Sequence, residues 1–250
     1  MDNKDQIPVL EIKDLHKSFG DNHVLKGFSL KLFEGENLVI MGKSGSGKSV
    51  MVKCMIGLIK PDSGTITIRG QDISTMGHNE LDFLRTEIGF LFQGSALYDS
   101  MTVRENLEFP LRRHKDNVKS FKGTEESVKK ALDSVGLIDS IDKMPAELSG
   151  GMQRRVAFAR ALILKPKIIM YDEPTTGLDP ITSNEIIQLM RSIQKEYNTS
   201  SLIITHDVDC ARVISNRMIL LVDGINYAEG TFEELSTSSD HQTRAFFKNK

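Results

Sequence analysis

Two patterns of apolar and polar positions along the chain predict strands. Residues 9–12 and 29–32 alternate apolar with polar side chains, as half-buried strands do, and Asp21-Asn22 supplies a turn between them. Residues 38–41 are continuously apolar, which is typical of a strand buried on both faces of a parallel sheet. Three similar apolar runs follow later in the chain, at residues 168–171, 202–205 and 218–222.

Apolar residues three or four positions apart predict helices between these strands. One such stripe, Val52, Met55, Ile56 and Ile59, directly follows the first buried strand, and the turn residues 61–64 are expected to end its helix before a strand at 65–68. Two further stripes comprise Val128, Ala131, Leu132 and Val135, before Gly136 as a C-cap, and Ile186, Leu189, Met190 and Ile193.

Strands that alternate with helices predict an α/β fold with a parallel core sheet. The early alternating strands add a small antiparallel β-subdomain, and the mainly helical stretch adds an insertion at about residues 94–161. We expect one domain over residues 8–235 and a C-terminal tail over residues 236–250.

Composition narrows the class of protein. Apolar residues make up 39% of the chain and charged residues 26%, and the net charge of −2 does not favour a nucleic-acid partner. No apolar run approaches the roughly eighteen residues of a membrane span, and residues 1–8 lack a signal-peptide pattern. Cys54 and Cys210 lie in apolar segments and are expected to be buried, reduced thiols. We therefore expect a cytoplasmic protein that is peripheral to any membrane it serves.

A glycine-rich segment between the first buried strand and its helix matches G-x-x-x-x-G-K-[ST], the phosphate-binding loop of nucleotide-binding proteins. Its glycines allow the backbone N–H groups and the helix N-terminus to approach phosphate oxygens closely. Lys48 is expected to reach the β- and γ-phosphates of ATP, and the Ser49 hydroxyl to bind Mg²⁺. The predicted ATP-binding segment is Gly42, Lys43, Ser44, Gly45, Ser46, Gly47, Lys48, Ser49 and Val50.

Two acidic residues directly follow the buried strand at 168–171. Asp172 is expected at the carboxyl edge of the sheet, where open α/β sheets bind ligands, and its carboxylate suits Mg²⁺. Glu173 is the expected general base for the attacking water. Acidic residues after strands also cap helices, but the order of apolar strand, Asp172, Glu173 and Pro174 favours the catalytic interpretation.

Phe19 lies between the two early strands and is the leading aromatic candidate to stack on adenine, in a chain without tryptophan. An aromatic residue near a turn also suits a position in the core.

With these segments, Leu148-Ser149-Gly150-Gly151 makes the chain resemble the ATP-binding subunits of ABC transporters over residues 10–234. The resemblance implies a head-to-tail dimer with a second copy, in which Ser149, Gly150 and Gly151 bind the ATP held by the partner. It also implies that Gln93 contacts Mg²⁺ and acts in catalysis. By the same resemblance, Asp179 is expected to join the two sites and His206 to contact the γ-phosphate in catalysis, and Phe19 lies where the family has an adenine-stacking aromatic.

The stretch of residues 90–114 resembles the Mla-type subfamily, the ATPases of phospholipid and lipid-asymmetry transporters. Met152, where glutamine is more usual, and residues 144–147 resemble the same subfamily. The resemblance implies an integral membrane permease, an MCE-domain lipid-binding protein and a position on the inner face of the cell membrane. Candidate residues for contact with the permease are Phe92, Leu97, Tyr98, Met101 and Val103, each of which also suits the core of the helical insertion.

The sequence thus predicts an ATP-hydrolysing transporter subunit with phospholipid or a related lipid as cargo. One alternative is another cargo, such as an amino acid, a metal ion or a lipoprotein. A soluble ABC ATPase without a permease is a second alternative, but such proteins typically carry two ATPase halves or a long coiled coil. A non-catalytic ATP-binding module is a third, and the intact Lys48, Asp172, Glu173 and His206 argue against it.

Overall fold

The structure of the chain, a computed structural model, describes residues 6–114 and 123–248. The chain divides into two compact units, residues 1–82 with 200–250 and residues 83–199. Residues 1–5, part of the N-terminal segment that lacks a signal-peptide pattern, and residues 249–250 of the predicted tail lie outside the described residues.

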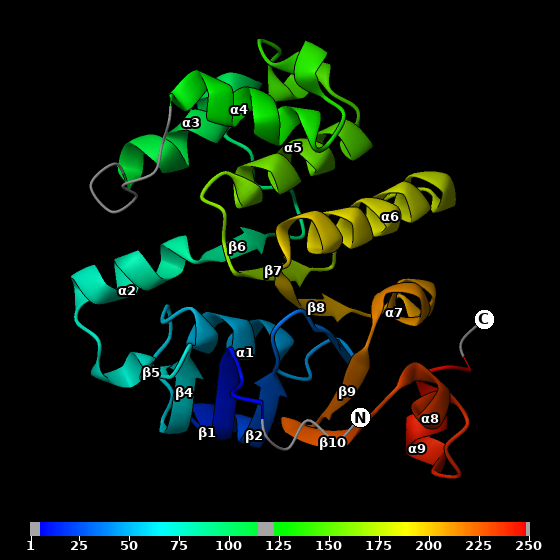
Figure 1. Ribbon diagram of the computed structural model, residues 1–250. Helices are drawn as coiled ribbons and strands as arrows, with labels where there is room; N and C mark the ends of the chain where they lie inside the picture. The colour runs from blue at the N-terminus through cyan, green and yellow to red at the C-terminus, as the bar shows by residue number, and fades with distance from the viewer. Residues whose placement is uncertain (1–5, 115–122, 249–250) are drawn as a thin grey trace. The chain divides into compact units, whose positions relative to one another are not determined.

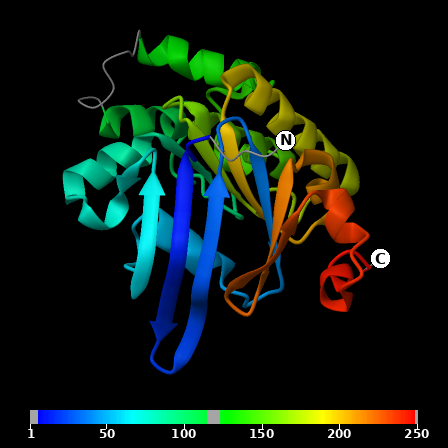
Figure 2. The ribbon, with the colours of Figure 1, turned by 60° about the horizontal axis from the view of Figure 1, so that its bottom comes forward.

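The first unit contains an antiparallel sheet with the strand order β2-β1-β4-β5. β1 (Leu10–Phe19) pairs with β2 (Asn22–Leu32) and β4 (Ser63–Ile68), and β4 pairs with the short β5 (Gln71–Asp72). Figure 2 shows β1 and β2 as a long hairpin with β4 beside it. The predicted alternating strands are confirmed, although the hairpin strands extend further than their apolar residues indicated.

The first unit also contains a mainly parallel group of strands. β3 (Asn37–Gly42) lies between β8 (Ser200–Thr205) and β9 (Arg217–Val222), parallel to both, and β10 (Ile225–Gly230) is antiparallel to β9. Every residue of β3 and β8 is buried, as their continuous apolar character predicts. The sequence interpretation missed β10, which has no buried residue and therefore only a weak apolar pattern.

The helix after the phosphate loop is shorter than predicted. α1 (Lys48–Met55) ends before Ile56, whereas the apolar stripe continued to Ile59. Gly57 adopts a left-handed φ of 68°, a conformation that glycine takes without steric cost and that commonly ends helices. The remaining helices of this unit are η1 (Ile73–Thr75), α7 (Val208–Ile214), α8 (Phe232–Ser236) and α9 (His241–Ala245).

The second unit contains two parallel strands, β6 (Ile88–Leu91) and β7 (Ile168–Asp172), and a group of helices (Figure 1). The expectation of a mainly helical region missed β6, because a four-residue strand leaves too short a pattern to distinguish from a helix. The helices are α3 (Val103–Arg113), α4 (Thr124–Asp133), η2 (Ile138–Ser140), η3 (Pro145–Glu147), α5 (Gly150–Leu162) and α6 (Pro180–Tyr197); α2 (His78–Thr86) contains the boundary between the units.

The predicted stripes identify most of the buried positions of α4 and α6. α4 buries Val128, Ala131 and Leu132. In α6 the stripe is confirmed except at Leu189, which is half-buried, while Ile187 is buried instead. Cys54 and Cys210 are free and buried, as predicted. The parallel strands, the antiparallel sheet and the helices confirm the α/β fold class.

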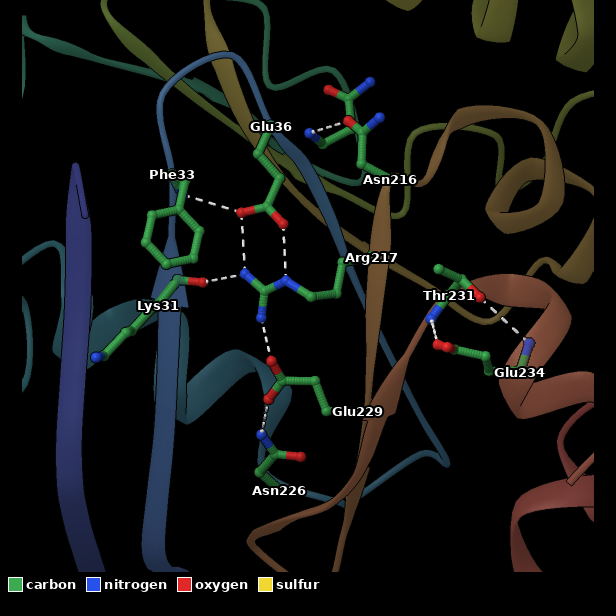
Figure 3. Close-up of polar contacts among 10 residues, drawn as sticks. Lys31, Phe33, Glu36, Asn216, Arg217, Asn226, Glu229, Thr231 and Glu234 are labelled. Atoms are coloured by element: carbon green, nitrogen blue, oxygen red, sulfur yellow. Dashed lines mark hydrogen bonds and ion pairs between the residues drawn. The ribbon is translucent and has the colours of Figure 1, made fainter. Parts of the chain in front are cut away.

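Arg217, the first residue of β9, connects several strands of the first unit (Figure 3). Its guanidinium binds both carboxylate oxygens of Glu36, at 2.8 and 2.9 Å, and donates to the Lys31 carbonyl oxygen at 2.6 Å. It also pairs with Glu229 on β10. Burial opposes the charge, but the hydrogen bonds and charges of Glu36 and Glu229 outweigh it and raise the pKa of Arg217. This cluster stabilises the edge of the sheet at which β3 and β9 begin.

Within the described ranges, no helix combines the length and the apolar character that a membrane crossing requires.

Candidate functional site

The phosphate loop and His206 follow two parallel strands of the first unit and lie at the same edge of those strands. β3 and β8 are parallel neighbours with Met41 opposite Thr205, so Gly42 and His206 each follow directly after a paired residue. The His206 side chain is exposed. The carboxyl edge of parallel strands is where open α/β sheets bind ligands, so both segments lie where a nucleotide is expected.

Two glycines of the loop occupy positions that a side chain would not fit. A Cβ on Gly42 would lie 2.8 Å from the Leu221 carbonyl oxygen. Gly47 has φ +104°, and a Cβ there would meet the Val24 carbonyl oxygen at 3.1 Å. Because Gly47 is the N-cap of α1, the helix begins without a side-chain cap. The first N–H groups of α1 therefore have no capping side chain and suit an anion.

The interior of the loop fits phosphate groups. Lys48 Nζ donates to the carbonyl oxygens of Gly42, at 2.5 Å, and of Lys43, at 3.0 Å, which holds the ammonium within the loop. The Ser46 hydroxyl is buried without a hydrogen-bond partner among the described residues. A buried hydroxyl normally has a partner, and a phosphate oxygen would supply one.

The second unit brings the other predicted catalytic residues to one edge of its own strands. β6 and β7 are parallel with Leu91 opposite Tyr171, so Gln93 and Glu173 each follow two residues after a paired position. Gln93 is exposed, Asp172 is half-buried and Glu173 is buried. An amide and two carboxylates at one edge form a donor set of the kind that Mg²⁺ prefers.

Glu173 is held in an unusual conformation. Its φ is +52°, a left-handed value that non-glycine residues rarely adopt. The Thr176 hydroxyl donates to Glu173 Oε2 at 3.1 Å, and the Thr176 N–H donates to the Glu173 carbonyl oxygen at 3.3 Å. Such strain persists only where the surroundings hold it, and it is common at functional sites.

The Leu-Ser-Gly-Gly segment begins a helix of the second unit. Ser149 is the N-cap of α5, and its hydroxyl accepts from the Met152 N–H at 3.3 Å. A Cβ on Gly151 would lie 2.7 Å from Thr182 Cγ2, whereas the nearest atom to a Cβ on Gly150 is 3.9 Å away. The start of α5 thus resembles that of α1 in carrying glycines at a helix N-terminus.

Asp179 caps α6 and accepts from the N–H groups of Ile181 and Thr182, each at 3.0 Å. The hydrogen bond from the Thr182 hydroxyl, followed by those from these backbone groups, lowers the pKa of Asp179.

Phe19 ends β1 with its side chain 49% exposed, and the Lys17 ammonium lies 5.4 Å from the ring centre. The exposure excludes the alternative of a core position for Phe19.

A groove of ≈ 480 Å³ in the second unit contains some of the predicted permease contacts. Phe92 and Tyr98 line it and are exposed, whereas Val103 belongs to the core. Basic side chains also line the groove, namely Arg113, His114 and Arg160.

Sequence reasoning missed two arginines of α5 that organise the second unit. Arg154 donates to the carbonyl oxygens of Phe92 and Thr176, and Arg160 to those of Ser95 and Ala96. Their spacing of six residues follows no helical stripe, so only their positions after the Leu-Ser-Gly-Gly segment could have drawn attention to them.

Comparison with known proteins gives the family directly. The sequence pattern described as "ABC transporter" matches residues 25–176, more than half of the chain. The probable ribonucleotide transport ATP-binding protein mkl of Mycobacterium leprae is 39% identical over 242 residues, which are 97% of this chain and 69% of that protein. The methionine import ATP-binding protein MetN of Clostridium tetani is 39% identical over 216 residues, 86% of this chain and 67% of that protein.

A plant relative is also similar. The chloroplastic protein TRIGALACTOSYLDIACYLGLYCEROL 3 of Arabidopsis thaliana is 37% identical over 255 residues, 95% of this chain and 73% of that protein.

Solved structures agree with the sequence relatives. The ATP-binding cassette MJ0796, a dimer bound to ADP and Pi, has a TM-score of 0.79 and 34% identity, covering 89% of this chain and 98% of that one. CbiO1 of Clostridium perfringens, part of the transporter complex cbiONQ, has a TM-score of 0.83 and 29% identity, covering 96% of this chain and 95% of that one. These findings confirm the predicted family, fold and use of Mg-ATP. The chain belongs to the ABC transporter family and is an ATP-hydrolysing cassette.

Proposed function

We propose that this ATPase drives a transporter for phospholipid or a related lipid, in the manner of the Mla-type subfamily. One observation carries the proposal: the segment after Gln93 forms an aromatic groove in the second unit, and residues 90–114, which form most of it, are those that resemble this subfamily. A relative named for trigalactosyldiacylglycerol, a galactolipid, supports a lipid cargo.

In the first unit, the phosphate loop binds the nucleotide. Lys48 and the N-terminus of α1 hold the phosphates, and His206, from the neighbouring strand end, contacts the γ-phosphate. ATP supplies the phosphoryl group, and Mg²⁺ bound with it would neutralise charge that develops on the phosphate oxygens. By the family resemblance, Ser49, Gln93 and Asp172 are the residues that would hold the metal, and Phe19 would stack on adenine.

Glu173 acts as general base toward the attacking water. Its carboxylate is oriented by the Thr176 hydroxyl and by the left-handed turn at its own backbone. Replacement by glutamine keeps the shape and removes the basicity. We expect Glu173→Gln to bind ATP with unchanged affinity, to lose hydrolysis and to accumulate as a closed dimer in size-exclusion chromatography. Hydrolysis at the parent rate would remove Glu173 from the base role.

The chain works as a head-to-tail dimer of two copies, on the inner face of the cell membrane. The ATPase domain comprises residues 8–235. In it, the γ-phosphate of the ATP that the second copy holds is bound by Ser149, Gly150 and Gly151, and Asp179 joins the two sites. The dimer of the related cassette MJ0796 supports this arrangement. The uncapped start of α1 and the glycines of α5 provide the two anion-binding helix ends that it requires.

The groove receives a segment of an integral membrane permease, and an MCE-domain protein is the expected lipid-binding partner. The association of CbiO1 with the complex cbiONQ supports a permease partner. Tyr98 and Phe109 pack against each other in the groove with tilted rings whose centres are 4.9 Å apart, so Phe109→Asp should release the permease while ATP binding is retained.

Another cargo is the alternative, since relatives are named for ribonucleotide and for methionine transport. Purification of the chain with its permease from membranes, followed by mass spectrometry of the bound small molecules, distinguishes them. Enrichment of phospholipid over the surrounding membrane supports the proposal, whereas enrichment of an amino acid or a nucleotide would replace it.

A further inference from the structure

Arg154 lies inside the second unit on the helix that begins with the Leu-Ser-Gly-Gly segment. Its side chain is only 5% exposed. The guanidinium donates to the Phe92 carbonyl oxygen at 3.1 Å and to the Thr176 carbonyl oxygen at 3.2 Å. A guanidinium presents five N–H donors in one rigid plane, so a single arginine can join two chain segments in a defined geometry.

The first of these segments carries Gln93. Phe92 directly precedes it, and Ser95 and Ala96 follow with left-handed φ values of 60° and 48°. Arg160, further along α5, donates to the Ser95 carbonyl oxygen at 3.1 Å and to the Ala96 carbonyl oxygen at 2.7 Å. The backbone on both sides of Gln93 is therefore held by arginines of the same helix.

The second segment carries Glu173. Thr176, whose carbonyl oxygen accepts from Arg154, donates its hydroxyl to Glu173 Oε2 at 3.1 Å. Its N–H donates to the Glu173 carbonyl oxygen and closes the turn that holds Glu173 at φ +52°. Arg154 thus holds Thr176, the residue that orients the Glu173 carboxylate.

We propose that Arg154 is a positioning residue for ATP hydrolysis, which transmits the position of the α5 N-terminus to Gln93 and Glu173. This inference rests on the proposed roles of Ser149 and Glu173. Because α5 is one continuous helix, a partner's nucleotide bound at Ser149 would fix the base that acts on the chain's own nucleotide. Each ATP in the dimer would then prepare the site that it does not occupy.

The test compares the steady-state hydrolysis of ATP by the purified parent chain with that of Arg154→Gln. Glutamine is too short and has too few donors to reach both carbonyl oxygens. Since the interaction matters for orientation rather than for nucleotide binding, we expect kcat to fall about 30-fold while the KM for ATP changes less than about threefold. Two results would overturn the positioning role: a loss of activity in Arg154→Gln that comes from a raised KM, or a kcat equal to that of the parent.

Arg155→Gln is the matched control. Arg155 is the next residue of the same helix, but it donates to the Val135 carbonyl oxygen and to Glu185, away from Gln93 and Glu173. Its kcat should stay within about twofold of the parent. An equal loss in both variants would indicate general damage to α5 and overturn the specific role.

Thr176→Val tests the route to Glu173, because it removes only the hydroxyl. If Arg154 acts through Thr176, the double variant should hydrolyse no more slowly than Arg154→Gln alone, whereas multiplied losses would show that the two act independently. If Arg154→Gln does not fold, Arg154→Lys keeps the buried charge, and a kcat lower by about fivefold at unchanged KM carries the same meaning.

Glu173→Gln, assayed in parallel, separates this inference from the proposed function. Parent-like hydrolysis by that variant refutes the base role itself. Loss of hydrolysis in Glu173→Gln with a parent kcat in Arg154→Gln refutes only the positioning role.

Discussion

The helices α1 and α5 both begin at glycine-rich segments, yet their first turns are arranged differently. α1 starts after Gly47 with no side-chain cap, while Ser149 caps α5 through a hydrogen bond to the Met152 N–H. Its length of 3.3 Å is long for an N–H···O bond. A helix start without a cap has N–H groups ready for a ligand, whereas a weakly capped one can exchange its cap for a ligand.

The difference in capping agrees with different proposed roles for the two helix starts. In the proposed dimer, α1 with Lys48 inside the loop would hold the chain's own nucleotide, and α5 would bind a phosphate of the partner's nucleotide. Substitutions at each helix start can break or sharpen this comparison.

Ser149→Arg should have the largest effect. The arginine side chain would obstruct the start of α5, so the dimer could not close on ATP and hydrolysis should fall to background. The affinity of the chain for ATP, measured by equilibrium dialysis, should not change, since the phosphate loop is intact. Ser192→Arg, at an exposed position of α6, is the control and should hydrolyse ATP like the parent. Loss of ATP affinity in Ser149→Arg would contradict this comparison, because it would show that the starts of α1 and α5 bind the same ATP molecule together.

Lys48→Ala should weaken ATP binding itself. Removal of a charged donor to phosphate is expected to cost about 3 kcal/mol, or roughly 100-fold in Kd. Isothermal titration calorimetry with a non-hydrolysable ATP analogue measures the loss. Lys53→Ala removes an exposed lysine from the last turn of α1 and should bind the analogue like the parent. A parent-like affinity in Lys48→Ala would show that the backbone N–H groups suffice.

The two glycines of α5 should respond differently to alanine. At Gly151 the methyl group would crowd Thr182, so we expect the free energy of unfolding to fall by about 1 kcal/mol. At Gly150 there is space, and the higher helix propensity of alanine should leave stability unchanged or raise it by about 0.5 kcal/mol. Urea unfolding without nucleotide measures both, and the opposite order would contradict the packing at the start of α5.

Ser149→Ala should lower stability only slightly, by less than Gly151→Ala. Loss of a long capping bond is expected to lower the free energy of unfolding by about 0.5 kcal/mol, at the low end for such caps. A loss above about 2 kcal/mol in the same unfolding experiment would show that Ser149 is mainly structural, contrary to the comparison with α1.

Functional motifs made of consecutive residues could be predicted from the sequence better than contacts between segments that are far apart in the chain. The phosphate loop could be recognised because strand, glycines, Lys48 and helix follow each other directly, and the structure has them in that order. The predicted end of α1 was wrong, because the apolar spacing continues to Ile59 whereas the backbone turns at Gly57.

Arg154 shows the limit of local patterns. Its carbonyl partners lie 62 and 22 residues away, in segments brought to it only by folding. An arginine after the Leu-Ser-Gly-Gly segment looks like any exposed helical cation until its burial is known. β6 was missed for a related reason, since four residues become a recognisable strand only beside β7.

Arg217 has a consequence for the cooperativity of the first unit. Its guanidinium is bonded to β2 at Lys31, to Glu36 before β3 and to β10 at Glu229, so one side chain connects strands of both sheets. The two sheets should therefore open together in native-state hydrogen exchange, with slowly exchanging amides of β2 and β9 reporting one common free energy. Removal of the Arg217 side chain would allow the β1–β2 hairpin to exchange on its own, ahead of the strands that hold the phosphate loop.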